Sequence, residues 1–337
     1  MQFQVATFFG AGMKILVTGA AGFLGSNLVL RLLSQGHTVI GIDDYSNGST
    51  RNLAAAFGHA AFKMIEGDVA ALQLVDCCGA DVDVLVHLAA KKIPRYGGAL
   101  QTLKVNYHGT DTILEYARLA KCRCVVASTS DVYGMNPDLP FDEDSSNCVT
   151  GSSQSPRWAY AVSKLFDEHL ALAYEEEYEI PVVVLRFFGS YGPNQPISWL
   201  GGPPPVFIEK ILKGETVPIH GDGLQTRSFT YVSDTIDGIE AAMFEQKACG
   251  QIINIGSDEE VTILELARRI KQVSDTPGEL RVEYVPYESF TGRRYQDVRR
   301  RVPDTRRCES LLGVRAKVSL DQGLMKTIAW QRTVMGL

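Results

Sequence analysis

The sequence predicts an α/β fold in which helices cover both faces of a doubly wound parallel sheet. Short apolar runs typical of buried strands alternate with segments of helical periodicity. A glycine-rich turn joins the first apolar run to the first helical segment. Strands that alternate with helices are typical of parallel sheets, because each crossover returns the chain to the same edge of the sheet.

The glycine-rich turn lies in residues 14–27, KILVTGAAGFLGSN. An apolar run over 15–18 precedes Gly19, Gly22 and Gly25. Gly19 makes the turn, Gly22 lets the backbone approach a pyrophosphate, and Gly25 lets the helix pack close to the strand. The helix N-terminus, with its unpaired amides, is then expected to bind the diphosphate of a dinucleotide.

An acidic residue ends the second apolar run. Asp43 follows residues 37–42 and lies eighteen residues after Gly25. A carboxylate there can accept hydrogen bonds from both hydroxyls of an adenosine ribose and repel a 2′-phosphate, so the pattern predicts a Rossmann domain that prefers NAD to NADP. The alternative is a glycine-rich turn that binds no ligand.

The composition is that of an ordinary globular protein. The chain has 337 residues, 45% hydrophobic and 21% charged, which suits two packed lobes. A formal net charge of −6 argues against nucleic acid or a membrane surface as a partner. The seven cysteines lack CxxC spacing and no apolar run has transmembrane length. The N-terminus lacks a signal-peptide pattern, so we expect a cytoplasmic protein with reduced thiols and no metal.

Further candidates for cofactor contacts lie at the ends of the next apolar runs. Asp68 can accept a hydrogen bond from an adenine amino group or cap the following helix. The run over 83–90 ends in small residues that let the backbone lie flat against a cofactor, and His87 within it is expected to be packed rather than catalytic. Asn106, near the start of a helix predicted from Val105, can bond backbone at the catalytic strand or cap its own helix.

A candidate acid–base set follows the fifth apolar run, 124–128. Thr129 ends this run, and Tyr160 and Lys164 lie four residues apart on a predicted helix. Residues with this spacing share one helix face, so the ammonium is expected to lie near the phenol and lower its pKa. A phenol of lowered pKa is a suitable general base for a sugar hydroxyl, whose proton Thr129 can share.

Two lobes that interleave are predicted. The boundaries are 13–188 with a returning segment near 230–257 for the dinucleotide-binding domain, and 189–229 with 258–337 for the second lobe. The returning segment contains a helix that begins at Val232 and a strand over 252–255, and the second lobe contains a helix from Val206 to Leu212.

Five motifs carry a resemblance to a known family. TGAAGFLG, HLAA, STSDVYG, YAVSK and LRFFGSYGPN, in this order, resemble the extended short-chain dehydrogenase/reductase family of NAD-dependent nucleotide-sugar epimerases, dehydratases and decarboxylases. The resemblance spans about residues 13–333. It implies a Rossmann domain with bound NAD, a smaller mixed α/β C-terminal lobe that holds a nucleoside-diphosphate sugar, and a homodimer formed through the helices after Asn106 and around Tyr160.

The resemblance also assigns roles to residues. Thr129, Tyr160 and Lys164 become the catalytic set. The cofactor contacts would be Gly19, Gly22, Phe23, Leu24, Gly25, Asp43, Asp68, Val69, Leu88, Ala89, Ala90, Asn106, Ser128, Tyr160 and Lys164. The substrate contacts would be Lys92, Arg95, Gly189, Val206, His220, Arg227 and Arg293. Arg227 and Arg293 belong to segments suited to a diphosphate, because arginine binds phosphate in bidentate fashion.

The resemblance fixes the first chemical step better than the outcome. Tyr160 would take the proton of the sugar C4 hydroxyl while NAD accepts hydride, giving a 4-keto sugar. FDED, SPRWAYAVSK and YQDV resemble the bacterial UDP-glucuronate decarboxylase of the aminoarabinose pathway, in which case Ser130, Asp131 and Arg306 would surround the uronate carboxylate. UDP-glucuronic acid decarboxylation is therefore the first interpretation.

Two departures from the family pattern keep other reactions open. Asp131 is one methylene shorter than the usual glutamate. Gly189 stands where the family commonly has asparagine, which removes a donor and is expected to open space for a rotating sugar, as a UDP-glucuronate or UDP-glucose 4-epimerase requires. NDP-sugar 4,6-dehydratases often have Asp-Glu where this chain has Ser130-Asp131. A non-catalytic dinucleotide-sensing protein is a distant alternative, since it would not need the acid–base set.

Overall fold

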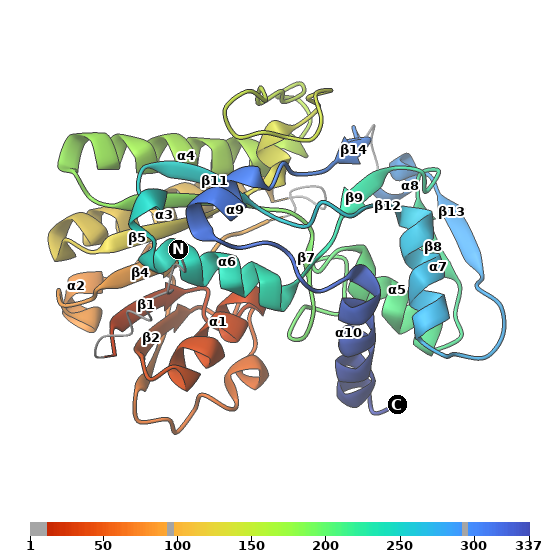
Figure 1. Cartoon of the computed structure of the whole chain (residues 1–337), viewed down its shortest axis with the longest axis horizontal. Coiled ribbons are helices and arrows are strands. Elements are labelled where there is room, and N and C mark those ends of the chain that lie inside the picture. The colour runs from red at the N-terminus through yellow and green to blue at the C-terminus, as the bar shows by residue number, and fades with distance from the viewer. Residues whose placement is uncertain (1–11, 93–97, 292–295) are drawn as a thin grey trace, which may run out of the picture.

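A seven-stranded parallel sheet forms the framework of one half of the molecule, at the left of Figure 1. The computed structural model describes residues 12–92, 98–291 and 296–337. In spatial order the strands are β11 (Gln251–Ile255), β6 (Val182–Phe187), β5 (Arg123–Thr129), β4 (Val84–His87), β1 (Lys14–Thr18), β2 (Thr38–Asp43) and β3 (Phe62–Glu66). Every neighbouring pair is parallel. The predicted α/β class and the returning strand β11 are therefore confirmed.

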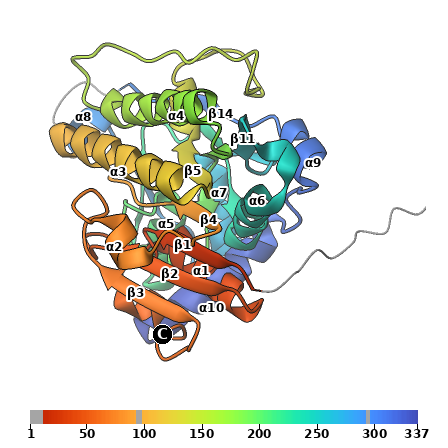
Figure 2. The same ribbon diagram turned by 90° about the vertical axis from the view of Figure 1, so that its left-hand side faces the viewer.

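Helices cover both faces of this sheet. Alternate strand residues divide between two apolar clusters, because successive side chains of a strand point to opposite faces. Ile15 and Val17 join the cluster that contains α1 (Phe23–Ser34) and α6 (Val232–Phe244). Leu16 joins the cluster of α3 (Ala99–Ala120) and α4 (Trp158–Tyr178), which lie side by side in Figure 2. The short α2 (Leu74–Cys78) packs against α3.

One predicted boundary was wrong. Helix α3 begins at Ala99 instead of near Val105, so Asn106 lies inside the helix, where it is buried, and does not cap it. The first turns of α3 carry exposed apolar side chains, Leu100 and Leu103. These residues weaken the amphipathic contrast by which a helix start is recognised in a sequence.

Within the residues that the structure describes, the C-terminal lobe contains three small sheets and four helices. Its strand pairs are β7 (Ser190–Tyr191) with β10 (Thr230–Tyr231), β9 (Thr226–Ser228) with both β12 (Glu260–Thr262) and β14 (Arg300–Arg301), and β8 (Val217–His220) with β13 (Val282–Val285). Its helices are α5 (Pro203–Leu212), α7 (Ile263–Val273), α8 (Tyr287–Thr291) and α10 (Leu320–Met335). Helices α5, α7 and α10 pack together.

The remaining elements lie beside the large sheet. Helix α9 (Arg306–Leu312) packs against α6 and β11. The 3₁₀ turns are η1 (Thr50–Leu53), η3 (Ser130–Tyr133) and η4 (Gln246–Ala248). Across the described ranges, no helix combines the length and the apolar character that a membrane crossing requires.

Candidate active site

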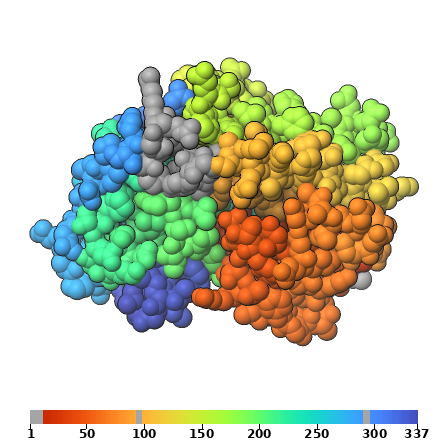
Figure 3. Space-filling model, turned by 180° about the vertical axis from the view of Figure 1, so that it is seen from behind, coloured from red at the N-terminus to blue at the C-terminus, as the bar shows by residue number. Residues whose placement is uncertain are grey.

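A cavity of about 460 Å³ lies at the carboxyl ends of the sheet strands. Its wall comes from the glycine turn, the ends of β4, β5 and β6, the start of α4, and loops of the C-terminal lobe. Seen from behind, the red N-terminal segment and the green part of the C-terminal lobe meet on one face (Figure 3). This is the edge at which parallel α/β sheets bind ligands.

The glycine turn leaves a helix N-terminus open toward the cavity. Gly19 has a φ of +69°, and a Cβ at Gly25 would lie 2.0 Å from the Gly19 carbonyl oxygen, so neither position tolerates a side chain. Gly22 precedes α1, whose N-terminus has no side-chain cap and no acidic residue in its first turn. Gly19, Gly22, Phe23, Leu24 and Gly25 all line the cavity. This arrangement fits an NAD diphosphate, since unpaired amides and the helix dipole attract anions.

Asp43 ties the end of β2 to the glycine turn. Its Oδ2 accepts from the Ala21 amide at 2.9 Å and its Oδ1 from the Tyr45 amide at 2.8 Å. Burial raises the pKa of this carboxyl group. Asp43 is not among the described residues that line the cavity, so its contact with an adenosine ribose stays a prediction. Asp68 accepts from the Ala70 amide at 3.0 Å within the turn that follows β3, and it does not cap the following helix α2, which begins after Gln73.

The end of β4 contributes small and apolar residues. Leu88 and Ala90 line the cavity, whereas the Ala89 amide donates to the Thr18 hydroxyl. His87 is 1% exposed with its Nδ1 2.7 Å from Thr18 Oγ1, and burial lowers its pKa to about 3. It is therefore neutral and packed, in agreement with the sequence analysis.

Two other predicted cofactor residues act behind the cavity wall. Val69 is buried in the cluster beneath α3. Asn106 Oδ1 accepts from the Lys91 amide, and its Nδ2 donates to Ser163 Oγ, both at 2.8 Å. The Asn106 side chain therefore bonds the backbone after β4 and does not cap its own helix. Its second bond, to Ser163, ties α3 to α4.

Thr129, Tyr160 and Lys164 line the same cavity. Thr129 ends β5, and Tyr160 and Lys164 lie on successive turns of α4. Burial raises the pKa of the Tyr160 phenol, the charges of Asp131 and Asp167 add to this, and a hydrogen bond with Thr129 opposes it. The net direction of the Tyr160 pKa is thus upward, opposite to the lowering expected from Lys164, whose Nζ pairs with Asp167 Oδ2 at 3.0 Å.

A buried ion pair braces this end of the sheet. Ser128, which lines the cavity, donates to Glu168 Oε1 at 2.5 Å. Arg186 on β6 donates to both oxygens of Glu168, at 2.9 and 2.6 Å. The bidentate pair fixes α4 against β5 and β6 and so holds Tyr160 in place. The sequence analysis did not assign Glu168 or Arg186 a role.

Two arginines, Arg157 and Arg301, lie beside Asp131 in the cavity wall. Arg301 Nη1 lies 2.5 Å from Asp131 Oδ1 and 3.4 Å from Ser130 Oγ, and Arg157 Nη2 lies 3.7 Å from the same Asp131 oxygen. Burial lowers the pKa of Arg301 to about 10, and the neighbouring Arg227 and Arg157 add to this, whereas Asp131 opposes it. Guanidinium groups held close together in a buried site favour an anionic ligand.

A second unit of the same cavity wall is centred on Asp297. Arg227 Nη2 lies 3.1 Å from Asp297 Oδ1, and the Tyr287 hydroxyl donates to Asp297 Oδ2 at 2.6 Å. Although burial acts to raise the pKa of Asp297, the charge of Arg227 and the bond from Tyr287 hold it below its usual value. Arg227, a predicted substrate residue, is thereby oriented at the cavity.

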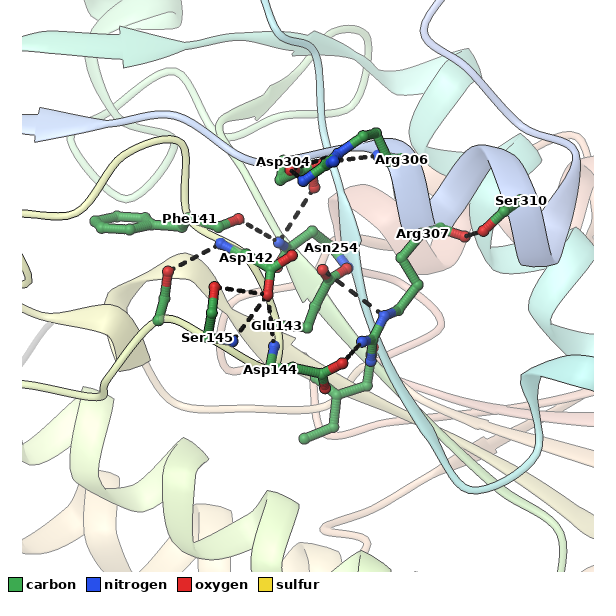
Figure 4. Close-up of polar contacts among 12 residues, drawn as sticks. Phe141, Asp142, Glu143, Asp144, Ser145, Asn254, Asp304, Arg306, Arg307 and Ser310 are labelled. Carbon is green, nitrogen blue, oxygen red and sulfur yellow. Dashed lines mark hydrogen bonds and ion pairs between the residues drawn. The ribbon is translucent and has the colours of Figure 1, made fainter.

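Arg306 does not reach this site. Its side chain is 83% exposed, and its Nε donates to Asp304 Oδ2 at 2.8 Å. Figure 4 shows Arg306 beside Asp304, while Arg307 extends toward Asp144. The reason is that α9 packs against β11 and α6, away from the cavity. The predicted place of Arg306 beside Ser130 and Asp131 is therefore wrong, and Arg301 occupies it.

The other predicted substrate residues divide into three groups. Lys92, Gly189, His220 and Arg227 line the cavity. Val206 does not: it is 5% exposed within the apolar core, and the next residue of α5, Phe207, faces the cavity instead. Arg95 and Arg293 lie outside the described residues.

Trp199 is a cavity residue that the sequence analysis missed. Its ring stacks on His220, with centroids 4.3 Å apart and planes 25° from parallel. A stacked aromatic pair at a cavity wall offers a flat apolar surface, of the kind on which a nucleobase can stack.

Gly189 does not open space for the sugar. Its φ is +49°, and a Cβ built on it would lie 2.1 Å from the Ser228 carbonyl oxygen. The room that a side chain would need is thus filled by the backbone of β9. The expectation that glycine enlarges the cavity here is wrong, because Gly189 packs directly against the backbone at Ser228.

The fold, the glycine turn and the Thr129–Tyr160–Lys164 set together define a dinucleotide-dependent enzyme of the short-chain dehydrogenase/reductase type. The profile of the NAD dependent epimerase/dehydratase family matches residues 15–256, and the chain belongs to this family. It is therefore an NAD-dependent enzyme of the nucleotide-sugar epimerase, dehydratase and decarboxylase class, as the sequence predicted.

Relatives of two activities resemble the chain over nearly its whole length. A UDP-N-acetyl-alpha-D-glucosaminuronate decarboxylase of Bacillus cytotoxicus is 34% identical over 95% of this chain and 98% of its own. UDP-glucuronic acid decarboxylase 1 of Xenopus tropicalis is 35% identical over 95% of this chain and 72% of its own. The UDP-glucuronic acid 4-epimerase of Bacillus cereus, solved with UDP-glucuronic acid and NAD, superposes with a TM-score of 0.85 at 31% identity, over 96% of this chain and all of its own.

Proposed function

We propose that this enzyme oxidises the C4 position of a UDP-linked uronic acid and decarboxylates the resulting 4-keto sugar, with UDP-glucuronic acid as the substrate. The observation that carries the proposal is the contact of Arg301 with Ser130 and Asp131 in the cavity that also contains Tyr160. A partly buried guanidinium beside the acid–base set suits a sugar that bears a carboxylate. The two decarboxylase relatives support the same conclusion.

In the first step Tyr160, as phenolate, takes the proton of the C4 hydroxyl. Thr129 lies at the same place and shares that proton through its hydroxyl. When bound, NAD supplies the acceptor for the hydrogen that leaves C4 with its electron pair. Lys164, on the next turn of α4, lines the same part of the cavity.

In the second step the new C4 carbonyl makes the C6 carboxylate that of a β-keto acid. The C5–C6 bond breaks, carbon dioxide leaves, and the bond electrons pass into an enolate of C4 and C5, which is then protonated at C5. Arg301 orients the carboxylate. Because Arg301 is already paired with Asp131, it binds the ground-state carboxylate less tightly, and this limits the stabilisation that would oppose loss of carbon dioxide.

The second candidate is 4-epimerisation of the same uronic acid. It is supported by the similarity to the Bacillus cereus UDP-glucuronic acid 4-epimerase, and the arginines around Asp131 would serve an epimerase equally well. Gly189 does not favour this candidate, since that glycine leaves no open space. A 4,6-dehydratase would act on a neutral sugar, for which these arginines have no evident partner.

Incubation of the purified protein with UDP-glucuronic acid and NAD tests the proposal. Mass spectrometry and proton NMR follow the products, with Tyr160→Phe as the inactive control. A product that has lost the mass of one carbon dioxide, as a UDP-pentose or its 4-keto form, is expected. An unchanged mass with a changed C4 proton coupling would establish the epimerase instead. Unreacted substrate would refute both and turn attention to UDP-glucose and dTDP-glucose.

We also propose a homodimer formed through α3 and α4. Large apolar side chains on these helices are exposed, among them Tyr107 at 39% and Phe166 at 49%, and their rings meet edge to face at 5.6 Å. Adjacent apolar side chains on two parallel-lying helices are typical of a surface that another chain covers. Light scattering after size-exclusion chromatography should give twice the chain mass, and Phe166→Asp should give the monomer.

The cytoplasm is the compartment that we propose. All seven cysteines are free, including Cys122 and Cys124, which lie close in sequence. Free thiols are typical of proteins in a reducing compartment. Microscopy of a fluorescent fusion in the source cell would test this proposal, and a signal outside the cytoplasm would contradict it.

A further inference from the structure

Asp167 forms a buried ion pair with the catalytic lysine. It lies three residues after Lys164 on α4, a spacing that brings two side chains onto one helix face. Its Oδ2 lies 3.0 Å from Lys164 Nζ, and both side chains are 1% exposed. The other oxygen, Oδ1, is buried and has no hydrogen-bond partner among the described residues. A carboxylate that is buried but only half satisfied is costly, so its position calls for a reason.

The pair changes the charge that Tyr160 experiences. An isolated ammonium on the next turn of the helix would favour the phenolate. With a carboxylate 3.0 Å from that ammonium, the two charges act on the phenol as a dipole, and most of the effect of Lys164 is offset. In agreement with this, Asp167 is among the groups that raise the pKa of Tyr160.

Other charged groups also face this part of the cavity. Asp131 on η3 acts against the Tyr160 phenolate, and Arg301 on β14 acts in its favour. His87 on β4 is neutral, since burial and the Lys164 charge lower its pKa to about 3. Arg157, which lies 3.7 Å from Asp131, and the Arg227–Asp297 pair also line the cavity, and the charges of the bidentate Arg186–Glu168 pair offset each other. Asp167 is therefore the carboxylate that acts directly on Lys164.

We infer that Asp167 is a positioning residue that holds the Lys164 ammonium in the active site and, by offsetting its charge, sets the pH range in which Tyr160 can take a proton from the substrate. The inference rests on the proposed role of Tyr160 as the base. It concerns the C4 oxidation alone, so it holds whether the 4-keto sugar is then decarboxylated or epimerised.

The test removes the charge and keeps the shape. Asp167→Asn preserves the volume of the side chain, and Asp237→Asn is the matched control, because Asp237 on α6 pairs with Arg31 at the same 3.0 Å outside the cavity. Tyrosines labelled with carbon-13 at Cζ report the phenol titration by NMR in the protein without substrate, and Tyr160→Phe identifies the signal. Asp167→Asn is expected to lower the pKa of Tyr160 by about one unit or more, and Asp237→Asn to leave it unchanged.

The pH profile gives a second readout. The acid limb of the rate of C4 oxidation is expected to move to lower pH in Asp167→Asn, by the same amount as the Tyr160 pKa, with whichever sugar nucleotide the unchanged enzyme converts. Failure of UDP-glucuronic acid as a substrate would therefore refute the proposed function and leave this test intact.

Two results would overturn the inference. One is a folded Asp167→Asn protein whose Tyr160 pKa and acid limb equal those of the unchanged enzyme. Asp167→Ser, which also lacks the charge but keeps a hydrogen-bond acceptor, is measured in parallel and should give the same shift in the Tyr160 pKa. The second result that would overturn the inference is failure of both variants to fold, because the carboxylate would then be required for folding and not for the action of Tyr160 as a base.

Discussion

Replacement of Arg301 by glutamine should discriminate against substrates that carry a carboxylate. The guanidinium lies 2.5 Å from Asp131, and the Arg301 side chain is 20% exposed. Loss of the guanidinium removes a charge-assisted hydrogen bond to the carboxylate of the bound sugar, which contributes about 1.5–3 kcal/mol. Arg157, whose Nη2 lies 3.7 Å from the same Asp131 oxygen, remains in the variant. The expected loss is therefore roughly 10–150-fold in affinity or in kcat/KM.

The assay compares two sugars and two arginines. Calorimetry gives the affinity of Arg301→Gln for UDP-glucuronic acid and for UDP-glucose, which lacks the carboxylate, and product formation gives kcat/KM for UDP-glucuronic acid. Arg306→Gln is the matched control, because the Arg306 side chain is 83% exposed and does not line the cavity. The control should therefore change kcat/KM by no more than a few-fold.

Two results would refute this reasoning. If Arg306→Gln reduces kcat/KM for UDP-glucuronic acid as much as Arg301→Gln does, the carboxylate is not bound where the structure places Arg301. If Arg301→Gln weakens UDP-glucose as strongly as UDP-glucuronic acid, Arg301 serves the fold or the nucleotide and not the carboxylate.

Three further predictions concern Tyr160, Gly189 and His87. Tyr160→Phe should reduce turnover by about 10²–10⁴-fold, while fluorescence should show that the variant still binds NAD. Gly189→Asn should lower the urea midpoint, since its Cβ would lie 2.1 Å from the Ser228 carbonyl oxygen, whereas Gly36→Asn, also at positive φ but with nothing within 4 Å, should lower it less. His87 has a folded pKa of about 3, below its value in the unfolded chain, so the unfolded state binds more protons below about pH 6.5. Stability should therefore fall as pH drops through that range, and His87→Phe, if it folds, should flatten the dependence seen in urea titrations.

Much of the fold could be predicted because its signals are local. A strand buried on both faces leaves a short apolar run, and the close approach of Gly25 to the Gly19 carbonyl leaves room for glycine only. The acid–base set was predictable for a similar reason. Thr129 ends a strand, and Tyr160 and Lys164 are one helical turn apart, so the topology of a parallel sheet brings them to one edge.

The substrate end could not be predicted in the same way, because it depends on pairings between distant segments. Arg301 reaches Asp131 since β14 pairs with β9 and places it beside Arg227, and nothing in an arginine-rich stretch indicates which residue will pair. The signal that was present is weak: Arg301 adjoins the buried Val302.

Two other features of the site could not be predicted from the sequence, for equally specific reasons. The phase of α5 directs Phe207 to the cavity and Val206 to the core, and an apolar helix with proline at its start does not reveal that phase. The pairing of Lys164 with Asp167 was visible as a spacing of three residues, yet the same spacing would occur if the lysine faced the phenol alone.

The most direct test of the central claim, oxidation at C4, uses UDP-glucuronic acid that carries deuterium at C4. The reaction is quenched within a single turnover, and mass spectrometry locates the label, with Tyr160→Phe as the control. We expect deuterium in the dinucleotide and a 4-keto sugar without it, whether carbon dioxide is then lost or not. Conversion of the substrate without deuterium in the dinucleotide at any quench time within the turnover would contradict the claim, because the reaction would then proceed without the oxidation that Thr129, Tyr160 and Lys164 are proposed to carry out. Deuterium on C4 of a finished product would not contradict it, since the reduced dinucleotide can return the label to C4.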